Sequence, residues 1–145
     1  MTVFMGADHR GFELKNKIME YLQEQDIRVE DMGNYTHDPV DHFPIYGKKV
    51  GMAVSQHPDE SFGIAVCGAG IGMSVAANRV KGARAGLCST VDQVQHGREN
   101  DHMNILCLAA DYLNFDQAKE LVDVFLKTTP KQDEKYVKRA QMLDE

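Results

Sequence analysis

The stretch FGIAVCGAGIGMSVAAN, residues 62–78, decides the fold of this chain. Its first six residues end at Cys67 and form an apolar run, which predicts a buried strand. Three alternate glycines, Gly68, Gly70 and Gly72, then break the run before a segment of small residues with helical potential. The stretch therefore predicts a strand that turns tightly into a helix.

This glycine turn is a candidate site for anion binding and for chemistry. Glycines let the backbone approach a ligand closely, and the first N–H groups of a helix have no partners within that helix. Cys67 ends the strand and faces the turn, where unpaired N–H groups favour a thiolate. Cys67 is thus a candidate base or nucleophile beside an oxyanion hole, and a buried inert cysteine is the alternative. The glycines are spaced too tightly for a dinucleotide-binding fingerprint.

Length and composition narrow the class of protein. A chain of 145 residues suits one domain with a proper core, so we expect a single domain over residues 1–145. The net charge of -6 argues against a nucleic-acid surface. We find no signal peptide and no apolar run that would cross a bilayer, so we expect a soluble cytoplasmic protein with no membrane partner. The three cysteines lack CxxC spacing, which fits a reducing compartment.

The rest of the chain alternates between strand and helix patterns. Strands are predicted at Val3–Met5, around Ile27 and Val29, at 62–67, at Ala83–Cys88 and at Asn104–Ala109. Helices are predicted at 14–22, at Ile45–Ser55, after the glycine turn, from Val91 to about Arg98, at 118–126 and in the tail 131–145. This alternation predicts a Rossmann-like three-layer α/β sandwich around a five-stranded parallel sheet.

Several polar residues fall where strands end. Ligands of such folds bind at the carboxyl ends of the strands. Asp8 and His9 follow the first predicted strand, and Cys67 ends the central one. The polar segment from Asn34 to Pro44 is a loop long enough to help line a site. One small ligand is therefore expected to meet Asp8, His9 and Cys67 together.

Five segments also carry a resemblance to a known family: Gly6–Gly11, the loop closing on Phe43–Pro44, Cys67–Gly72, Ala76–Arg79 and Gly82–Ala85. Together they resemble the type B ribose-5-phosphate isomerases and their relatives, the galactose-6-phosphate isomerase subunits. The likeness covers nearly the whole chain in register. Residues 35–54 look closest to the B subunits of the galactose-6-phosphate branch.

The resemblance implies an aldose–ketose isomerase of sugar phosphates that uses no metal and no cofactor. It also implies a homodimer or a dimer of dimers, with the site built across the subunit interface. Cys67 would be the base that moves a proton between C2 and C1 through a cis-enediolate, with the N–H groups from Gly68 through Ser74 holding the oxyanion. Carried over residue by residue, the catalytic set is Cys67, His102 and Asp8, and the substrate-binding set is His9, Phe43, Gly68, Ala69, Gly70, Gly72, Met73, Ser74, Asn100, Asp101, Lys135 and Arg139.

Some positions depart from the family pattern. Asn100 stands where many members carry a histidine that is held to open the furanose ring, and an amide cannot act as an acid–base catalyst. His102, Glu99 or Asp101 would then substitute, or the substrate is already in its open-chain form. Ala69 replaces a common threonine of the glycine turn, so a hydroxyl that would relay a proton is absent.

The phosphate-binding arginines of the family are also altered. A C-terminal pair spaced four apart falls on Lys135 and Arg139, and a third arginine falls on Asp111. Lysine keeps the charge but loses the bidentate fork of arginine. Asp111 would repel a phosphate if it pointed into the site, and Arg10 and Lys138 are the nearby cations that would compensate.

The prediction that follows is isomerisation of ribose 5-phosphate to ribulose 5-phosphate. The alternatives are another sugar phosphate, such as galactose or allose 6-phosphate or a tetrose phosphate, and a non-catalytic subunit that binds a sugar phosphate. The charged tail 131–145 would pack poorly alone, so we expect it to dock on a second subunit.

Overall fold

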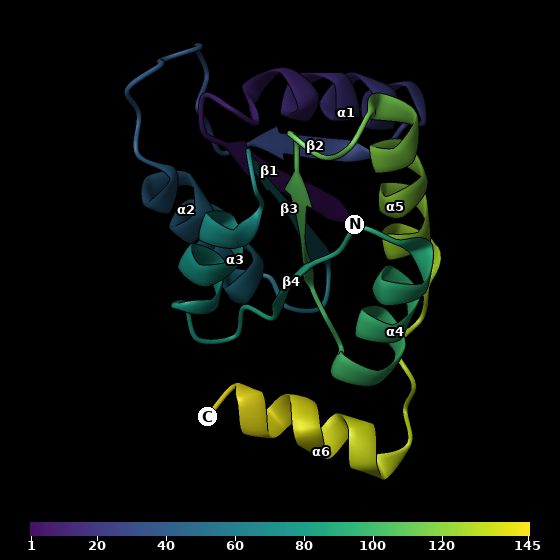
Figure 1. Ribbon diagram of the computed structural model, residues 1–145. Coiled ribbons are helices and arrows are strands. Elements are labelled where there is room, and N and C mark those ends of the chain that lie inside the picture. The colour runs from purple at the N-terminus through teal and green to yellow at the C-terminus, as the bar shows by residue number, and fades with distance from the viewer.

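A five-stranded parallel sheet in the order β2-β1-β3-β5-β4 forms the middle layer of the computed structural model, which describes residues 1–145 (Figure 1). The central strands β1 and β3 pair from Thr2 opposite Ser61 to Ala7 opposite Val66. The strands are β1 (Thr2–Ala7), β2 (Arg28–Asp31), β3 (Ser61–Cys67), β4 (Ala85–Leu87) and β5 (Ile105–Ala109). The predicted parallel sheet is confirmed.

Helices cover both faces of this sheet. They are α1 (Phe12–Glu24), α2 (Phe43–Gln56), α3 (Ile71–Asn78), α4 (Val91–Asp101), α5 (Phe115–Lys127) and α6 (Glu134–Leu143). Apolar side chains of α2 and α3 form one hydrophobic core against the sheet, and those of α1, α4 and α5 form the other (Figure 1). The predicted three-layer α/β sandwich is therefore confirmed.

Strand β3 serves both cores because successive side chains of a strand point to opposite faces. Ile64 and Val66 lie in the core with α1, α4 and α5. Ala65 and Cys67 lie in the core with α2 and α3. The alternation thus places the Cys67 thiol on the face that α3 covers, next to the turn that leads into this helix.

The outer strands and the first strand differ in length from the prediction. β1 runs from Thr2 to Ala7 rather than from Val3 to Met5, because Gly6 and Ala7 continue the ladder with β3. β4 spans only Ala85–Leu87 instead of Ala83–Cys88, since it is an edge strand that pairs with β5 alone.

Helices α1, α2, α4 and α5 are longer than predicted, and the added residues of α2 and α4 have a clear local cause. α2 begins at Phe43 rather than Ile45, because Pro44 fits the first helical turn, where an N–H group would have no partner anyway. α4 begins with a capping box between Thr90 and Gln93 and continues to Asp101 rather than ending near Arg98. The polar residues 98–101, which lie shortly before β5, are therefore helical.

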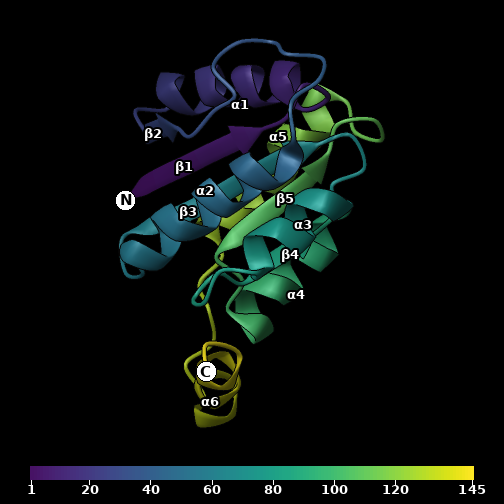
Figure 2. The same ribbon diagram turned by 90° about the vertical axis from the view of Figure 1, so that its left-hand side faces the viewer.

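Helix α6 stands apart from the sandwich (Figures 1 and 2). It is anchored near its end, where Nη1 of Arg84 pairs with Oδ2 of Asp144 at 2.7 Å. Met142 and Leu143 of this end are 58% and 65% exposed, as an unpartnered helix would leave them. Each helix of the chain is too short or too polar to cross a lipid bilayer.

Candidate active site

The turn after β3 brings a backbone N–H group against the Cys67 thiol. Cys67 is 6% exposed, and the N–H of Gly70 donates to its Sγ at 3.2 Å. Gly70 adopts a φ of +75°, and a Cβ there would lie 2.4 Å from Cδ1 of Leu87. Only glycine tolerates both the left-handed backbone and this close approach. The contact with the sulfur therefore depends on Gly70.

The same turn presents a set of free N–H donors. Those that make no hydrogen bond belong to Gly68, Ala69, Ile71, Gly72 and Met73. The N–H of Ser74 donates to the carbonyl of Gly70 at 3.1 Å. It is therefore not a free donor, although the family resemblance implies that it holds the oxyanion. Free donors at the start of α3, where the helix dipole is positive, make an anion site beside Cys67.

Phe43 forms one wall of this turn. It begins α2, and its ring lies so close to Gly72 that a Cβ on this glycine would approach ring atom Cε2 to 2.8 Å. Phe43 as a whole is 38% exposed, so it is not enclosed by the core. Phe43 is thus placed to cover a ligand that binds at the start of α3.

Asp8 lies beside Cys67 because β1 and β3 are neighbours in register. Its N–H donates to the carbonyl of Val66 at 3.4 Å. Its Oδ1 accepts N–H groups from Arg10 and Gly11, each at 3.0 Å, and so shapes the turn before α1. Oδ2 of Asp8 makes no hydrogen bond in this structure, which leaves it available to a ligand although the side chain is buried.

His9 is held by a carboxylate from the loop between β2 and α2. Its Nδ1 lies 2.7 Å from Oδ1 of Asp41, and its N–H donates to the same oxygen at 3.1 Å. Asn34 donates to the other oxygen of Asp41 at 3.1 Å. Burial raises the pKa of Asp41, but hydrogen bonds from His9 and Asn34 outweigh burial and hold this pKa below its ordinary value.

This pairing fixes which nitrogen of His9 faces a ligand. An ionised carboxylate only accepts hydrogen bonds, so Nδ1 of His9 carries the hydrogen and Nε2 is left unbonded. Ligating atoms of Asp8, His9 and Asp41 lie within 4.8 Å of one another, which is close enough for a metal ion. The hydrogen bond between Nδ1 and Asp41 accounts for that closeness, and we assign no ion to the cluster.

Lys15 anchors the loop that carries Asp41. It is fully buried, and its Nζ donates to the carbonyl of Asn34 at 2.6 Å and to Oδ1 of Asp31 at 2.8 Å. The loop therefore starts from a fixed point before it reaches Asp41. The sequence indicated that this loop lines a site, but it did not identify Asp41 or Asn34, because nothing local marks which of the loop acids turns inward.

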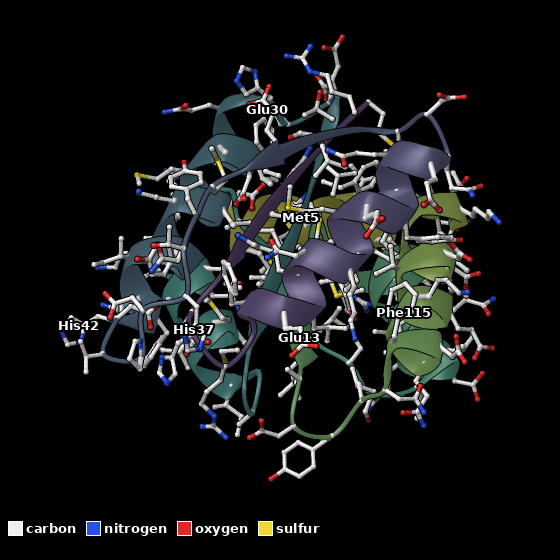
Figure 3. All side chains as sticks on the ribbon, turned by 90° about the horizontal axis from the view of Figure 1, so that it is seen from above. Met5, Glu13, Glu30, His37, His42 and Phe115 are labelled. Carbon is white, nitrogen blue, oxygen red and sulfur yellow. The ribbon has the colours of Figure 1, made fainter.

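The loop histidines differ in their surroundings. The ring of His37 packs edge-on against the rings of Phe12 and His9, with centroids 5.8 and 6.4 Å apart. Figure 3 shows His37 near the start of α1 and His42 farther out on the same loop. His42 is exposed and makes no side-chain cap to α2. His37 thus belongs to the rim of the site, and His42 lies outside it.

Arg10 and Asp111 meet over the glycine turn. Nη2 of Arg10 and Oδ2 of Asp111 form an ion pair. The guanidinium lies against Gly68, where a Cβ would come within 2.1 Å of its Cζ. The N–H of Asp111 donates to the carbonyl of Gly68 at 3.0 Å. The aspartate therefore faces the turn with its charge already paired.

A second group of predicted site residues lies at the other end of the sheet. Asn100, Asp101 and His102 precede β5. The first residue of β5 pairs with Gly63 in the first half of β3, whereas Cys67 pairs with Ala109 at the end of β5. Asn100 and His102 are bonded locally, with Nε2 of His102 2.7 Å from the carbonyl of Lys131. One chain does not bring these residues together with Cys67.

Lys135 and Arg139 are likewise remote from the glycine turn. Both lie on α6, and their charged groups sit over the ring of Tyr136, 4.9 and 5.9 Å from its centroid. Figure 2 shows α6 separated from the carboxyl ends of the strands by the body of the sandwich. These cations reach a Cys67 only if α6 meets another copy of the chain.

Two cavities lie near the edge strand β4. The larger, about 710 Å³, is lined by residues that include Asn78, Leu87, His96 and Leu143, and it does not touch Cys67. A second of about 430 Å³ reaches Ala69 of the glycine turn. The larger cavity is therefore not the candidate active site. The identification of the site rests on the Cys67 thiol and the N–H donors beside it.

Comparison with known proteins gives consistent matches. The ribose/galactose isomerase family model matches residues 3–143. Ribose-5-phosphate isomerase B of Escherichia coli (strain K12) is 35% identical over 124 residues, which cover 86% of this chain and 82% of that protein.

Solved structures agree with this. The crystal structure of ribose-5-phosphate isomerase B from Mycoplasma genitalium with bound ribulose-5-phosphate superposes with a TM-score of 0.93 and 31% identity, over 99% of this chain and 93% of that one. The enzyme of the same name from Thermotoga maritima gives a TM-score of 0.90 and 38% identity, over 99% and 97% of the two chains.

Proposed function

This chain belongs to the ribose/galactose isomerase family, and we propose that it interconverts ribose 5-phosphate and ribulose 5-phosphate with Cys67 as the catalytic base. The observation that carries the proposal is the position of the Cys67 sulfur at the end of β3, beside the free N–H groups of the turn. Proton abstraction next to a carbonyl needs a base and fixed donors for the oxygen that becomes negative. The turn supplies both.

The reaction follows from this arrangement. The Cys67 thiolate removes the proton from C2 of the open-chain aldose, which gives a thiol and a cis-enediolate. The free N–H groups at the start of α3 hold the oxygen on which charge develops, and one such donor is worth roughly 10²- to 10³-fold in rate. The thiol then returns the proton to C1, while the hydroxyl proton of O2 passes to O1. Asp8 is the candidate carrier for that second proton, since its Oδ2 is free.

We also propose that a second copy of the chain completes the site. Within one chain Arg10 is paired with Asp111, so a substrate dianion needs further cations. Helix α6 stands away from the sandwich and carries Lys135 and Arg139, and apolar residues such as Val75 of α3 are exposed. A homodimer in which α6 reaches the glycine turn of the other copy would supply these cations and would cover the exposed apolar residues.

An assay against a panel of sugar phosphates tests the reaction. Ribose 5-phosphate would be turned over fastest, with allose 6-phosphate, galactose 6-phosphate and erythrose 4-phosphate as competitors. Faster turnover of a hexose or tetrose phosphate would replace the substrate but keep the chemistry. Absence of turnover on every sugar phosphate would contradict the proposal and favour a non-catalytic binding subunit.

Mixing two inactive variants tests the shared site. Cys67→Ala removes the base, and Arg139→Gln removes a cation that we assign to the other copy. Dimers formed from one chain of each kind would contain one site with both residues intact, so activity should return when the variants are unfolded and refolded together. A mixture that stays as inactive as its components would contradict a site shared between copies.

A further inference from the structure

The geometry points to Arg10 as the residue that binds the phosphate group of the substrate at the carboxyl end of the sheet. Asp111 is the competing anion: a ligand binds Arg10 only if it displaces the Asp111 carboxylate from the guanidinium. This inference rests on the proposed function. It assigns a role to an ion pair that the isomerisation chemistry itself does not use.

The position of the guanidinium is the first support. It lies against Gly68, so it adjoins the free N–H groups of the glycine turn. The side chains that meet the other two glycines are those of Leu87 and Phe43, and neither carries a charge. Arg10 is therefore the permanent positive charge of the turn, and the neighbouring His9 presents its unbonded Nε2 from the same segment.

The charges around the turn give the second support. Asp8 and Asp41 already engage N–H groups and His9, so they do not neutralise Arg10. The one carboxylate on the guanidinium is that of Asp111. Without Arg10, a phosphate at this edge would face three carboxylates and no permanent cation from the same chain.

The exposure of the pair shows that it is exchangeable. The side chains of Arg10 and Asp111 are 52% and 41% exposed, and ion pairs this open contribute little to stability. A phosphate dianion offers a guanidinium two parallel charge-assisted hydrogen bonds, which a single carboxylate contact does not match. A sugar phosphate can thus take over the guanidinium, whereas a neutral sugar cannot.

The backbone of Asp111 keeps the competitor in place. Its N–H is bound to the carbonyl of Gly68, so its carboxylate stays at the turn whether or not Arg10 is engaged. Asp111 therefore holds Arg10 over Gly68 in the empty site and lowers the affinity for every anion. A carboxylate ligand gains little from this exchange, and the dianion of a phosphate ester gains most.

Substitution of Arg10 tests the binding role. For Arg10→Gln we expect the KM for ribose 5-phosphate and the Kd for inorganic phosphate to rise at least about 10-fold, with kcat changed less than about 3-fold. Arg10→Lys should fall between this variant and the wild type. Arg28→Gln is the matched control, because Arg28 forms an exposed ion pair with Glu30 on β2, away from the site. It should leave both constants unchanged.

A double-mutant cycle tests the role of Asp111. Asp111→Asn should tighten inorganic phosphate binding severalfold when Arg10 is present, and clearly less in the Arg10→Gln background, where only the direct repulsion between Asp111 and phosphate is relieved. Equal effects in both backgrounds, or an unchanged Kd for phosphate in Arg10→Gln, would overturn the inference. Calorimetry with inorganic phosphate needs no turnover. If the wild type binds phosphate through Arg10 but isomerises no ribose 5-phosphate, the proposed function fails and this inference stands.

Discussion

Nδ1 of His9 lies 2.7 Å from Oδ1 of Asp41, a residue 32 positions later in the chain. The side chain of Asp41 is 2% exposed and also accepts a hydrogen bond from Asn34, so it is the fixed member of the pair. His9 keeps 30% of its side chain exposed, and its Nε2 makes no hydrogen bond. Asp41 therefore fixes the orientation and the tautomer of the His9 ring, as carboxylates hydrogen-bonded to functional histidines commonly do.

Asp41→Asn should weaken catalysis without removing a group that touches the substrate. The amide can no longer accept the hydrogen of Nδ1 as strongly, so the ring loses its fixed orientation, and we expect kcat/KM for ribose 5-phosphate to fall about 10- to 100-fold. His42→Asn, a substitution at the exposed end of the same loop, should leave kcat/KM within about 2-fold. Equal losses of kcat/KM in the two variants would contradict a specific role for the contact between His9 and Asp41 and would indicate a general effect of the loop.

The same carboxylate should make stability depend on acid. The pKa of Asp41 is lower in the folded chain than its ordinary value of 3.8, so Asp41 contributes stability above that value and loses it as the pH falls through the folded pKa. Urea unfolding from pH 7 down to about pH 3 should therefore show a steeper loss of unfolding free energy for the wild type than for Asp41→Asn. Parallel pH profiles would contradict this.

Gly70→Ala should damage both stability and turnover. The left-handed φ of +75° disfavours alanine, and its Cβ would meet Leu87 and the backbone of Leu108. We expect a loss of about 1–3 kcal/mol in unfolding free energy, together with a clear drop in kcat. Gly82→Ala is the control, since Gly82 has a φ of +90° but contacts only Ser55. It should lose stability and keep kcat, so a matching drop in kcat would contradict a special role for the turn.

Thiol alkylation should distinguish Cys67 from the other cysteines. Burial raises the pKa of Cys88 to about 11, and burial together with the other two thiols raises the pKa of Cys107. Near pH 8 only about one Cys88 in a thousand is then a thiolate. Iodoacetamide should modify Cys67 first and abolish activity in step, as mass spectrometry of the native protein would show. Modification of Cys88 at the same rate would contradict this.

The sequence was sufficient to predict the site residues that lie at the ends of strands. Asp8 and Cys67 were expected together because parallel neighbours end at the same edge, and the register of β1 and β3 places both residues at the carboxyl ends of adjacent strands. The sequence did not identify Asp41 as a site residue. Its inward orientation depends on hydrogen bonds with His9 and Asn34, and no repeating pattern in the local sequence indicates them.

The position of His102 shows a different kind of limit. The family resemblance grouped His102 with Cys67, yet a residue just before a parallel strand lies at the amino end of the sheet. Within one chain the two are therefore apart, as are Cys67 and the cations of α6. Sequence periodicity describes one chain, and it carries no information on which surfaces of two copies meet.

The most direct test of the account is the isomerisation of ribose 5-phosphate in D₂O by the wild type and by Cys67→Ala, followed by NMR. The wild type should incorporate solvent deuterium at C1 of ribulose 5-phosphate, because Cys67 exchanges its proton with solvent during the enediolate step. Cys67→Ala should lose about 10²- to 10⁴-fold in rate while it still binds inorganic phosphate. Cys88→Ala, at a buried thiol outside the site, should keep its rate. A Cys67→Ala protein that isomerises within 10-fold of the wild type would contradict the assignment of Cys67 as the base.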